Sequence, residues 1–305
     1  PKAVGEDACA RTFVTQFGAR AYRRPLAPDE VDGLLARYAT GKAQGGFTGG
    51  IRLALHAMLV SPHFLYHVEL GTPDVTDFEL ASRLSYFLWG SMPDLALAQA
   101  AADGKLQERA VLEAQARRLL ADPRARARIR NFHHDWLGLG EIAVRRVLPP
   151  SLVNAAREDV LATIMDAVSA PRAPLSAMFL TDTAFVDKTL AASYGLTGNF
   201  GATATKVTLT EPERRGVLTR VGALLTHGTP SSRGKFVRAD VLCQIVPNPP
   251  ANVSTELPDP KPGEPPRARW ERHVTDPSCG GCHRLIDPIG FAFDHFDDMG
   301  KFRTM

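Results

Sequence analysis

Cys279, Cys282 and His283 are the residues of this chain whose types and spacing are best suited to chemistry. They read C-x-x-C-H, the signature at which a c-type haem is attached. In such a site each thiol forms a thioether bond with one haem vinyl group, and a neutral imidazole ligates the iron. The motif therefore predicts one covalent haem c, with Cys279 and Cys282 as attachment points and His283 as the proximal ligand.

A C-x-x-C pair also occurs in zinc sites and in redox-active dithiols. A zinc ribbon needs a second C-x-x-C, and the sequence contains none. A redox dithiol usually opens a helix after a β-strand, and no strand pattern precedes Cys279. Both uses stay open as alternatives, but the histidine directly after Cys282 favours haem.

The second axial ligand of the iron is left open by the sequence. Only about twenty residues follow His283, so the distant methionine that small cytochromes use has no room. The ligand is therefore local, or comes from the helical part of the chain, or is missing because the site is open. The candidates are His133, His134, His227, His273, His295 and Met299.

An aromatic run follows the signature. We expect Phe291, Phe293 and Phe296 to cover one face of the haem. The pair Asp287-Pro288 is typical of a turn that would bring this run back over the haem edge.

Basic residues flank the same segment. Arg284, Lys301 and Arg303 are candidates to bind the haem propionates, because guanidinium groups pair well with carboxylates. A solvated basic edge is the equally acceptable alternative. Elsewhere, His56, His63 and His67 are candidates for a separate metal site, although no acidic partner stands beside them in the sequence.

Helical patterns dominate the first four-fifths of the chain, so we predict a mainly α fold. The glycine-rich stretch 41–50 indicates a loop, and Lys206–Leu209 carries the best strand signal. Helices are predicted near residues 7–23, 29–38, 51–60, 76–89, 107–120, 124–137, 151–169, 185–194, 211–226 and 231–246.

The composition changes at Pro247, where eight prolines enter within twenty residues. Such a segment forms neither helix nor sheet and indicates an extended strap. We therefore expect a multi-helix body over residues 1–246, a proline-rich linker over 247–266, and a short cytochrome-c-like haem segment over 267–305.

Charge and hydropathy limit the possible settings. The chain has 305 residues and a formal net charge of +3, without a block of like charges that would indicate nucleic-acid binding. No apolar run is long enough for a transmembrane helix. Because haem c is attached outside the cytoplasm, we expect a periplasmic or extracellular protein whose signal peptide lies outside this chain. In that compartment the two remaining cysteines, Cys9 and Cys243, are expected to form a disulfide.

The chain resembles the planctomycete cytochrome C family, which comprises large secreted proteins of unknown function. The resemblance rests on the tail Asp287–Arg303, which is similar to D-P-x-G-F-x-x-x-x-F-D-x-x-G-x-x-R, and on the run Leu80–Gly90. Shorter matches are Ala21–Leu26, Arg214–Thr219 and Arg233–Arg238. Members of this family commonly extend on both sides, so the resemblance implies a processed or interior part of a longer protein. The tail after the signature also resembles that of di-haem cytochrome c peroxidases.

Three functions are compatible with these features. The first is electron transfer by a secreted haem c protein, together with a redox partner protein or other cytochrome subunits. The second is a peroxidase-like oxidoreductase with an open iron site. In the third, the haem only fastens the C-terminal segment to a structural helical module. Whether the chain is an enzyme is left open.

We also expect the haem segment to depend on the rest of the chain. About forty residues bury too little surface to hold a haem alone. The haem is therefore expected in a groove between this segment and the helical body, with the helix that carries His133 and Trp136 as the first choice for the opposite face.

Overall fold

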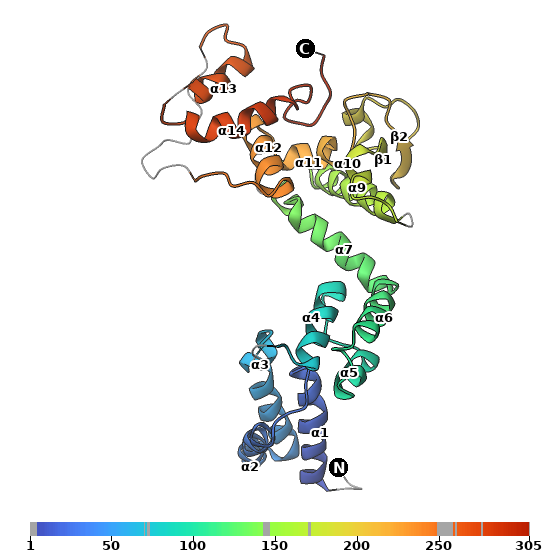
Figure 1. Ribbon diagram of the computed structural model, residues 1–305, viewed down its shortest axis with the longest axis vertical. Coiled ribbons are helices and arrows are strands. Elements are labelled where there is room, and N and C mark those ends of the chain that lie inside the picture. Colours follow the sequence, from blue (N-terminus) through green and yellow to red (C-terminus); the bar gives the residue numbers. More distant parts are fainter. Residues whose placement is uncertain are drawn as a thin grey trace. The chain divides into compact units, whose positions relative to one another are not determined.

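The computed structural model describes residues 5–69, 71, 74–142, 147–169, 172–248, 259, 261–275 and 277–304. The mainly α prediction is confirmed: helices account for most of the described chain, with one small two-stranded sheet (Figure 1). The chain divides into two compact units, Pro1–Ile129 and Arg130–Met305, which are described separately below. None of the described helices is long and apolar enough to cross a membrane.

The first unit is a set of helices joined by short turns. Its helices are α1 (Glu6–Ala21), α2 (Pro28–Leu59), α3 (Pro62–Leu65), α4 (Asp77–Trp89), α5 (Leu95–Ala102) and α6 (Arg109–Leu120), and α7 (Pro123–Trp136) leads into the second unit. Helices α1 and α2 pack side by side on a core of small, aliphatic and aromatic side chains. Helices α4, α5 and α6 enclose a second core around Trp89, whose indole Nε1 donates to Leu119 O at 2.8 Å.

Local signals explain the ends of these helices. Thr76 caps α4 and forms a capping box with Glu79, and Gly90 ends the helix in the left-handed conformation. The expected loop over residues 41–50 is reduced to a sharp kink. Helix α2 consists of two arms that join at Gly45 and Gly46, whose backbone angles are not helical. Gly41 and Gly49 are in backbone contact across the kink, where a side chain on either would clash.

The second unit combines helices with irregular segments. Its elements after α7 are η1 (Leu139–Glu141), α9 (Pro150–Ser169), α10 (Ala177–Leu180), β1 (Thr183–Val186), η2 (Ala191–Tyr194), β2 (Thr205–Thr208), η3 (Val217–Thr219), α11 (Val221–Thr226), α12 (Pro230–Phe236), the π-helical turn η4 (Val237–Val241), α13 (Pro266–Thr275) and α14 (Gly280–Phe291). The strands are antiparallel, with Thr183 opposite Thr208 and Val186 opposite Thr205. The predicted strand near Lys206 is thereby confirmed.

Two predicted helices of this unit are wrong. Residues 185–194 form the end of β1, a turn and the short η2, and the side chains of Thr183–Val186 alternate between half-buried and buried, as expected of a strand. Residues 211–226 form only η3 and α11. Gly216 interrupts this stretch at φ 64°, in close contact with the backbone of Phe179.

A buried polar cluster ties β1 to α9. Asp159 is fully buried; its Oδ1 accepts from Phe185 N at 2.7 Å, and its Oδ2 accepts from the Tyr194 hydroxyl. Burial raises the pKa of Asp159 above its ordinary value, although Tyr194, Phe185 and Arg220 oppose this shift. The cluster satisfies backbone groups that the irregular chain would otherwise bury without partners.

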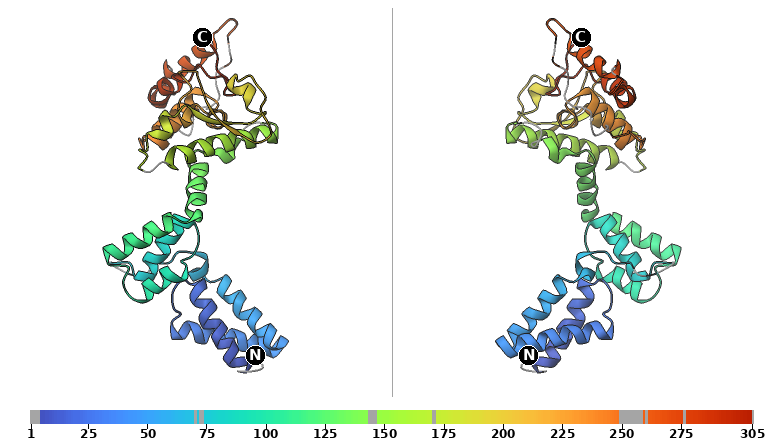
Figure 2. Two further views of the ribbon diagram at one scale, coloured as in Figure 1. Left: turned by 90° about the vertical axis from the view of Figure 1, so that its right-hand side faces the viewer. Right: turned by 90° about the vertical axis from the view of Figure 1, so that its left-hand side faces the viewer.

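The C-terminal segment 267–305 belongs to the second unit and packs against its other helices. Helix α14 lies against α12 and α13, as Figures 1 and 2 show from three directions. The boundary between the two compact units lies within α7, at Ile129/Arg130. The sequence predicts the boundary between the helical body and the C-terminal segments after residue 246. Most of the predicted proline-rich strap lies outside the described residues.

Candidate haem-attachment site

The three residues of the signature lie at the start of α14: Cys279 is the N-cap, and Cys282 and His283 are in the first turn. Cys279 precedes the helix, and its carbonyl accepts from Cys282 N at 3.2 Å and from His283 N at 3.1 Å. Residues separated by three and four positions share one face of a helix. Cys282 and His283 are adjacent and therefore point about 100° apart, with the direction of Cys279 between them, so the two thiols and the imidazole lie on one broad face of the helix start. Both thiols are free and half-buried.

A buried carboxylate and a hydroxyl hold the imidazole. His283 Nδ1 lies 2.9 Å from Asp287 Oδ2, and Ser231 Oγ donates to Asp287 Oδ1 at 2.6 Å. Asp287 is fully buried, one helical turn after His283. A carboxylate only accepts hydrogen bonds, so Nδ1 carries the proton that it donates to Asp287. This tautomer leaves Nε2 as the nitrogen suited to iron.

The same three residue types occur in hydrolytic triads, but the geometry differs from that of a triad. In a triad the histidine contacts the acid through one ring nitrogen and the nucleophile through the other. Here Ser231 Oγ lies 3.3 Å from Nδ1, the nitrogen that also faces Asp287, and its hydroxyl proton is directed to the carboxylate. Ser231 is therefore a support of Asp287 rather than an activated nucleophile.

Two glycines allow α12 and α14 to approach closely enough for this contact. A Cβ atom at Gly234 would lie 1.9 Å from Ile286 O, and one at Gly290 would lie 1.9 Å from Pro230 O. Any side chain at either position would force the helices apart. The crossing brings Ser231, near the start of α12, to Asp287 on α14.

Buried arginines attach the rest of the haem segment. Arg233 donates to the carbonyl oxygens of Phe293 and Phe296 at 3.1 Å and of Asp297 at 2.9 Å. Arg214 donates to Gly300 O at 2.8 Å. The segment after α14 is thus held by the side chains of Arg214, which precedes η3, and of Arg233 on α12. Dependence of haem binding on the helical body stays a prediction.

The aromatic run occupies three separate environments. Phe296 is buried, and the Arg214 guanidinium lies 4.7 Å from its ring centroid. Phe293 lines a small cavity together with body residues such as Leu224. Phe291 is half-buried, with the Arg267 guanidinium 4.6 Å from its ring centroid. The described contacts of these three rings are with other residues of the chain, and their contact with a haem stays a prediction.

The basic candidates differ in how firmly they are held. Arg284, Lys301 and Arg303 are all exposed. Arg303 Nε donates to Asp294 O at 2.9 Å, which ties the end of the chain to the turn after α14. Burial raises the pKa of the nearby Asp294, although Arg267 opposes this shift. Asp287-Pro288, expected as a turn, lies inside α14 instead. Pro288 is exposed there and has no amide hydrogen to donate to the preceding turn.

The candidates for a second axial ligand are dispersed. His133 is buried on α7 between the rings of Phe132 and Trp136, and His134 contacts Asp135 at 2.9 Å. The helix that packs most extensively against α14 is α12, not the His133 helix.

Of the remaining candidates, His295 and Met299 belong to the haem segment itself, and His227 lines the same small cavity as Phe293. His227 stacks on Phe236 at 4.2 Å, and His295 stacks on Phe302 at 5.6 Å. Met299 is half-buried and packs against the core of the second unit. The side chain of His273 lies outside the described residues.

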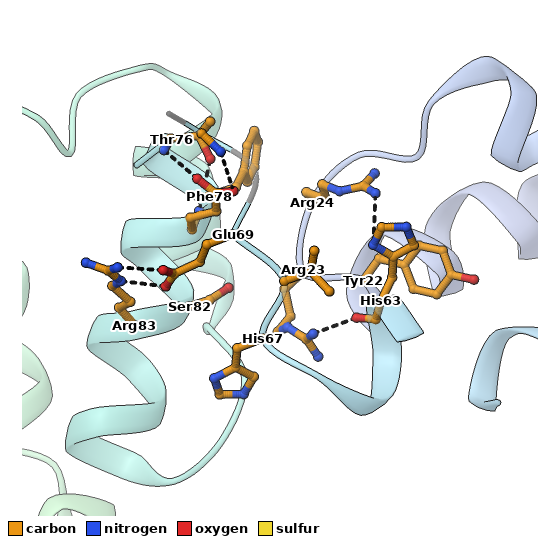
Figure 3. Close-up of a pocket in the computed structure, with 13 residues that line it drawn as sticks. Tyr22, Arg23, Arg24, His63, His67, Glu69, Thr76, Phe78, Ser82 and Arg83 are labelled. Carbon is orange, nitrogen blue, oxygen red and sulfur yellow. Dashed lines mark hydrogen bonds and ion pairs between the residues drawn. The ribbon is translucent and has the colours of Figure 1, made fainter. Parts of the chain in front are cut away.

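The histidines proposed for a separate metal site lie in the first unit. His63 and His67 line a pocket of about 300 Å³ (Figure 3). His63 Nε2 lies 3.5 Å from Glu30 Oε1, and His67 packs on the ring of Tyr86. His56 lines a different pocket. Within the described ranges, no three His, Cys, Asp or Glu side chains group in a way that could hold a metal ion.

The predicted Cys9–Cys243 disulfide is absent from the structure, where both residues are free thiols. Cys9 belongs to the first unit and Cys243 to the second. A bridge between them would therefore have to join two separately packed units, which sequence reasoning did not anticipate.

Sequence reasoning also missed two residues of the site. Asp287 was interpreted only as a turn residue, although its spacing of four from His283 is the spacing that pairs side chains on a helix. Ser231 gave no local signal, because it is 56 positions from Asp287 and reaches it only through the α12–α14 crossing.

Three families of unknown function match the chain in succession. Residues 9–69 match the family described as PSD5, a protein of unknown function (DUF1595), and residues 75–196 match PSD4 (DUF1592). Residues 214–305, which include the C-x-x-C-H signature, match PSCyt3 (DUF1588). No curated protein and no solved structure is significantly similar to the chain. The chain is thus similar, over nearly its whole length, to the planctomycete cytochrome-like PSD and PSCyt families.

Proposed function

We propose that this chain is a c-type haem protein that transfers electrons outside the cytoplasm, as one part of a larger cytochrome assembly. The observation that carries the proposal is the shared face of Cys279, Cys282 and His283, combined with the hydrogen bond from His283 Nδ1 to a buried carboxylate. The donor set fits a haem c: two thiols, and one imidazole whose tautomer directs Nε2 to a metal.

Attachment needs no oxidant. Each thiol adds across one vinyl group: the S–H bond breaks, a C–S and a C–H bond form, and no electrons are lost. The bound haem would supply an iron that exchanges one electron between its ferric and ferrous states. The chain's own contribution is to fix the imidazole through Asp287 and Ser231 and to anchor α14 through Arg233 and the glycine crossing.

Expression of the full chain in an oxidising compartment, together with haem-attachment machinery, tests the proposal. We expect the denatured protein to retain the mass of one haem, and Cys279→Ser with Cys282→Ser to remove it. Cys9→Ser is the matched control, because it removes a thiol from the other unit and should leave the haem in place. A wild-type chain without a haem adduct would overturn the proposal.

A second candidate function is a haem oxidoreductase with an open iron site. Asp287 favours this second function, because a carboxylate that is hydrogen-bonded to the proximal imidazole stabilises high oxidation states of iron. The electronic spectrum separates the two. A low-spin, six-coordinate iron supports electron transfer, whereas a high-spin iron that binds cyanide or carbon monoxide supports catalysis.

A further inference from the structure

The hydrogen-bond partner of His283 is a carboxylate and not a neutral group. A ligating histidine often donates its second N–H to a neutral backbone carbonyl, which orients the ring with little electronic effect. In this chain the acceptor is the Asp287 carboxylate, at 2.9 Å and fully buried. Burying a carboxylate costs free energy unless charge-assisted hydrogen bonds compensate for the lost hydration. We therefore ask what the buried charge of Asp287 does.

Both oxygens of Asp287 are used. Oδ2 accepts from His283 Nδ1, and Oδ1 accepts from the Ser231 hydroxyl at 2.6 Å. His283 and Asp287 are fixed relative to each other by one turn of α14, and Ser231 comes from the other helix of the crossing. The carboxylate therefore cannot rotate away from the imidazole without breaking a bond to α12.

A carboxylate that accepts a hydrogen bond from Nδ1–H increases the electron density on the imidazole. The effect reaches Nε2 and strengthens its donation to a bound iron, which stabilises the ferric state more than the ferrous state. Hydrogen bonding in the second coordination shell is one of the few means by which a protein sets the potential of a haem.

We propose that Asp287, oriented by Ser231, is a positioning residue that lowers the reduction potential of an iron bound by His283. The inference rests on the proposed function, because it assumes haem attachment at Cys279 and Cys282. It implies that the chain passes electrons at low potential and is reduced only by a strongly reducing partner.

The test is the reduction potential of the haem-loaded full chain, measured for the wild type and three variants. Asp287→Asn keeps an oxygen near Nδ1 but removes the charge. We expect its equilibrium constant for reduction to rise about tenfold, equivalent to about 59 mV for a one-electron couple. Ser231→Ala keeps the charge and releases one oxygen, so we expect a measurable but smaller change. Ser232→Ala is the matched control on the same helix and should leave the potential unchanged.

The outcomes separate the inference from the proposed function. Failure of the wild type to bind haem overturns the proposed function and, with it, the inference. A haem-loaded wild type whose potential is unaltered in Asp287→Asn overturns the inference alone. If Asp287→Asn fails to fold or to bind haem, Ser231→Ala decides: a potential equal to that of Ser232→Ala overturns the proposed role of the carboxylate.

Discussion

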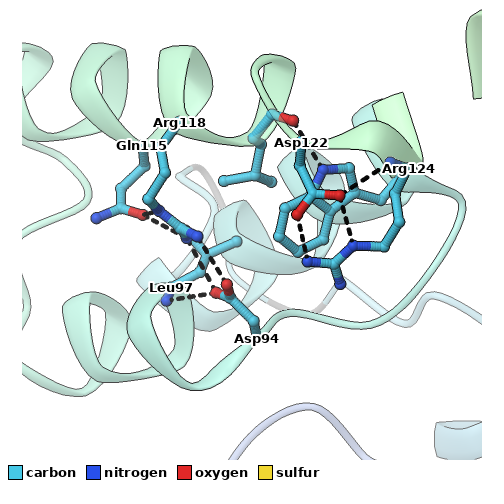
Figure 4. Close-up of polar contacts among 8 residues, drawn as sticks. Asp94, Leu97, Gln115, Arg118, Asp122 and Arg124 are labelled. Atoms are coloured by element: carbon cyan, nitrogen blue, oxygen red, sulfur yellow. Dashed lines mark hydrogen bonds and ion pairs between the residues drawn. The ribbon is translucent and has the colours of Figure 1, made fainter. Parts of the chain in front are cut away.

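The two units differ in how deeply their arginines are buried. Among the described residues of the first unit no arginine is buried, and most of its paired arginines contact carboxylates at partly exposed positions; half-buried Arg23, which donates to His63 O and Tyr66 O, is an exception. Arg118 binds Asp94 at 2.7 Å, and Arg124 binds Asp122 at 2.8 Å above the ring of Trp89 (Figure 4). In the second unit, buried arginines donate to backbone carbonyl oxygens. Arg220 is fully buried and donates to Thr183 O at 2.5 Å, and Arg214 and Arg233 follow the same pattern.

This difference reflects how regular each unit is. In a helix the backbone N–H and C=O groups bond to one another, so the arginines of a helical unit are not needed to satisfy backbone carbonyls. They pair with carboxylates at the surface instead, where each ion pair contributes little to the free energy of unfolding. The second unit contains turns and extended segments whose carbonyl groups are buried without helical partners. A guanidinium has five N–H donors in a fixed fork and satisfies several such groups at once. Buried arginines therefore hold the irregular chain that surrounds the candidate site.

Replacement of Arg233 by Met should show the largest effect. The change leaves the carbonyl groups of His227, Phe293, Phe296 and Asp297 without their donor. We expect the second unit to lose about 3–5 kcal/mol of unfolding free energy. Hydrogen exchange of the amides in residues 280–304 measures this loss directly.

The matched control for this prediction is Arg117→Met in the first unit. Arg117 pairs with Glu113 at 2.6 Å on an exposed helix surface. We expect a change below about 0.5 kcal/mol. Equal losses for the two variants would contradict the distinction between the two units.

Replacement of Gly290 by Ala tests the helix crossing. The added methyl group would lie 1.9 Å from Pro230 O, a backbone atom that cannot move alone. We expect a loss of about 2–3 kcal/mol and the separation of Ser231 from Asp287. Gly281→Ala on the same helix has no atom within 4 Å of the new methyl group, so its unfolding midpoint should stay the same or rise. A fully stable Gly290→Ala protein would rule out the tight crossing.

Acid should weaken the first unit through Glu30. The hydrogen bond from Arg24 lowers the pKa of the Glu30 carboxyl to about 2 from its ordinary value of 4.5. The contribution of the Glu30–Arg24 interaction to the free energy of unfolding is therefore present above pH 4.5 and is lost as the pH falls towards 2. We expect Glu30→Gln to cost the first unit about 1–2 kcal/mol at pH 7.

The pH series provides the check on this prediction. The difference between wild type and Glu30→Gln, followed by hydrogen exchange in α1 and α2, should vanish near pH 2. The bonds from Arg233 to carbonyl groups contain no group that titrates in this range. A difference that persists unchanged at pH 2 would show that Glu30 acts by packing instead of charge.

The sequence by itself determined much of the helical framework and one face of the site. The capping box at Thr76, the stop at Gly90 and the helical period of residues 151–169 are local signals, and the structure follows them. The spacing of Cys279, Cys282 and His283 likewise fixes a shared helical face wherever the helix lies, because 3.6 residues make one turn.

Only the tertiary structure decided which groups surround that face. Residues 185–194 form a strand end and a short helical turn because Asp159 on α9 accepts the Phe185 amide, and no local pattern contains that partner. Ser231 meets Asp287 because Gly234 and Gly290 let two helices cross at backbone contact. Phe296 is buried under Arg214, 82 positions earlier, instead of standing beside Phe291 and Phe293. Such contacts depend on chain segments that are remote in sequence, so their energies appear only once the chain is folded.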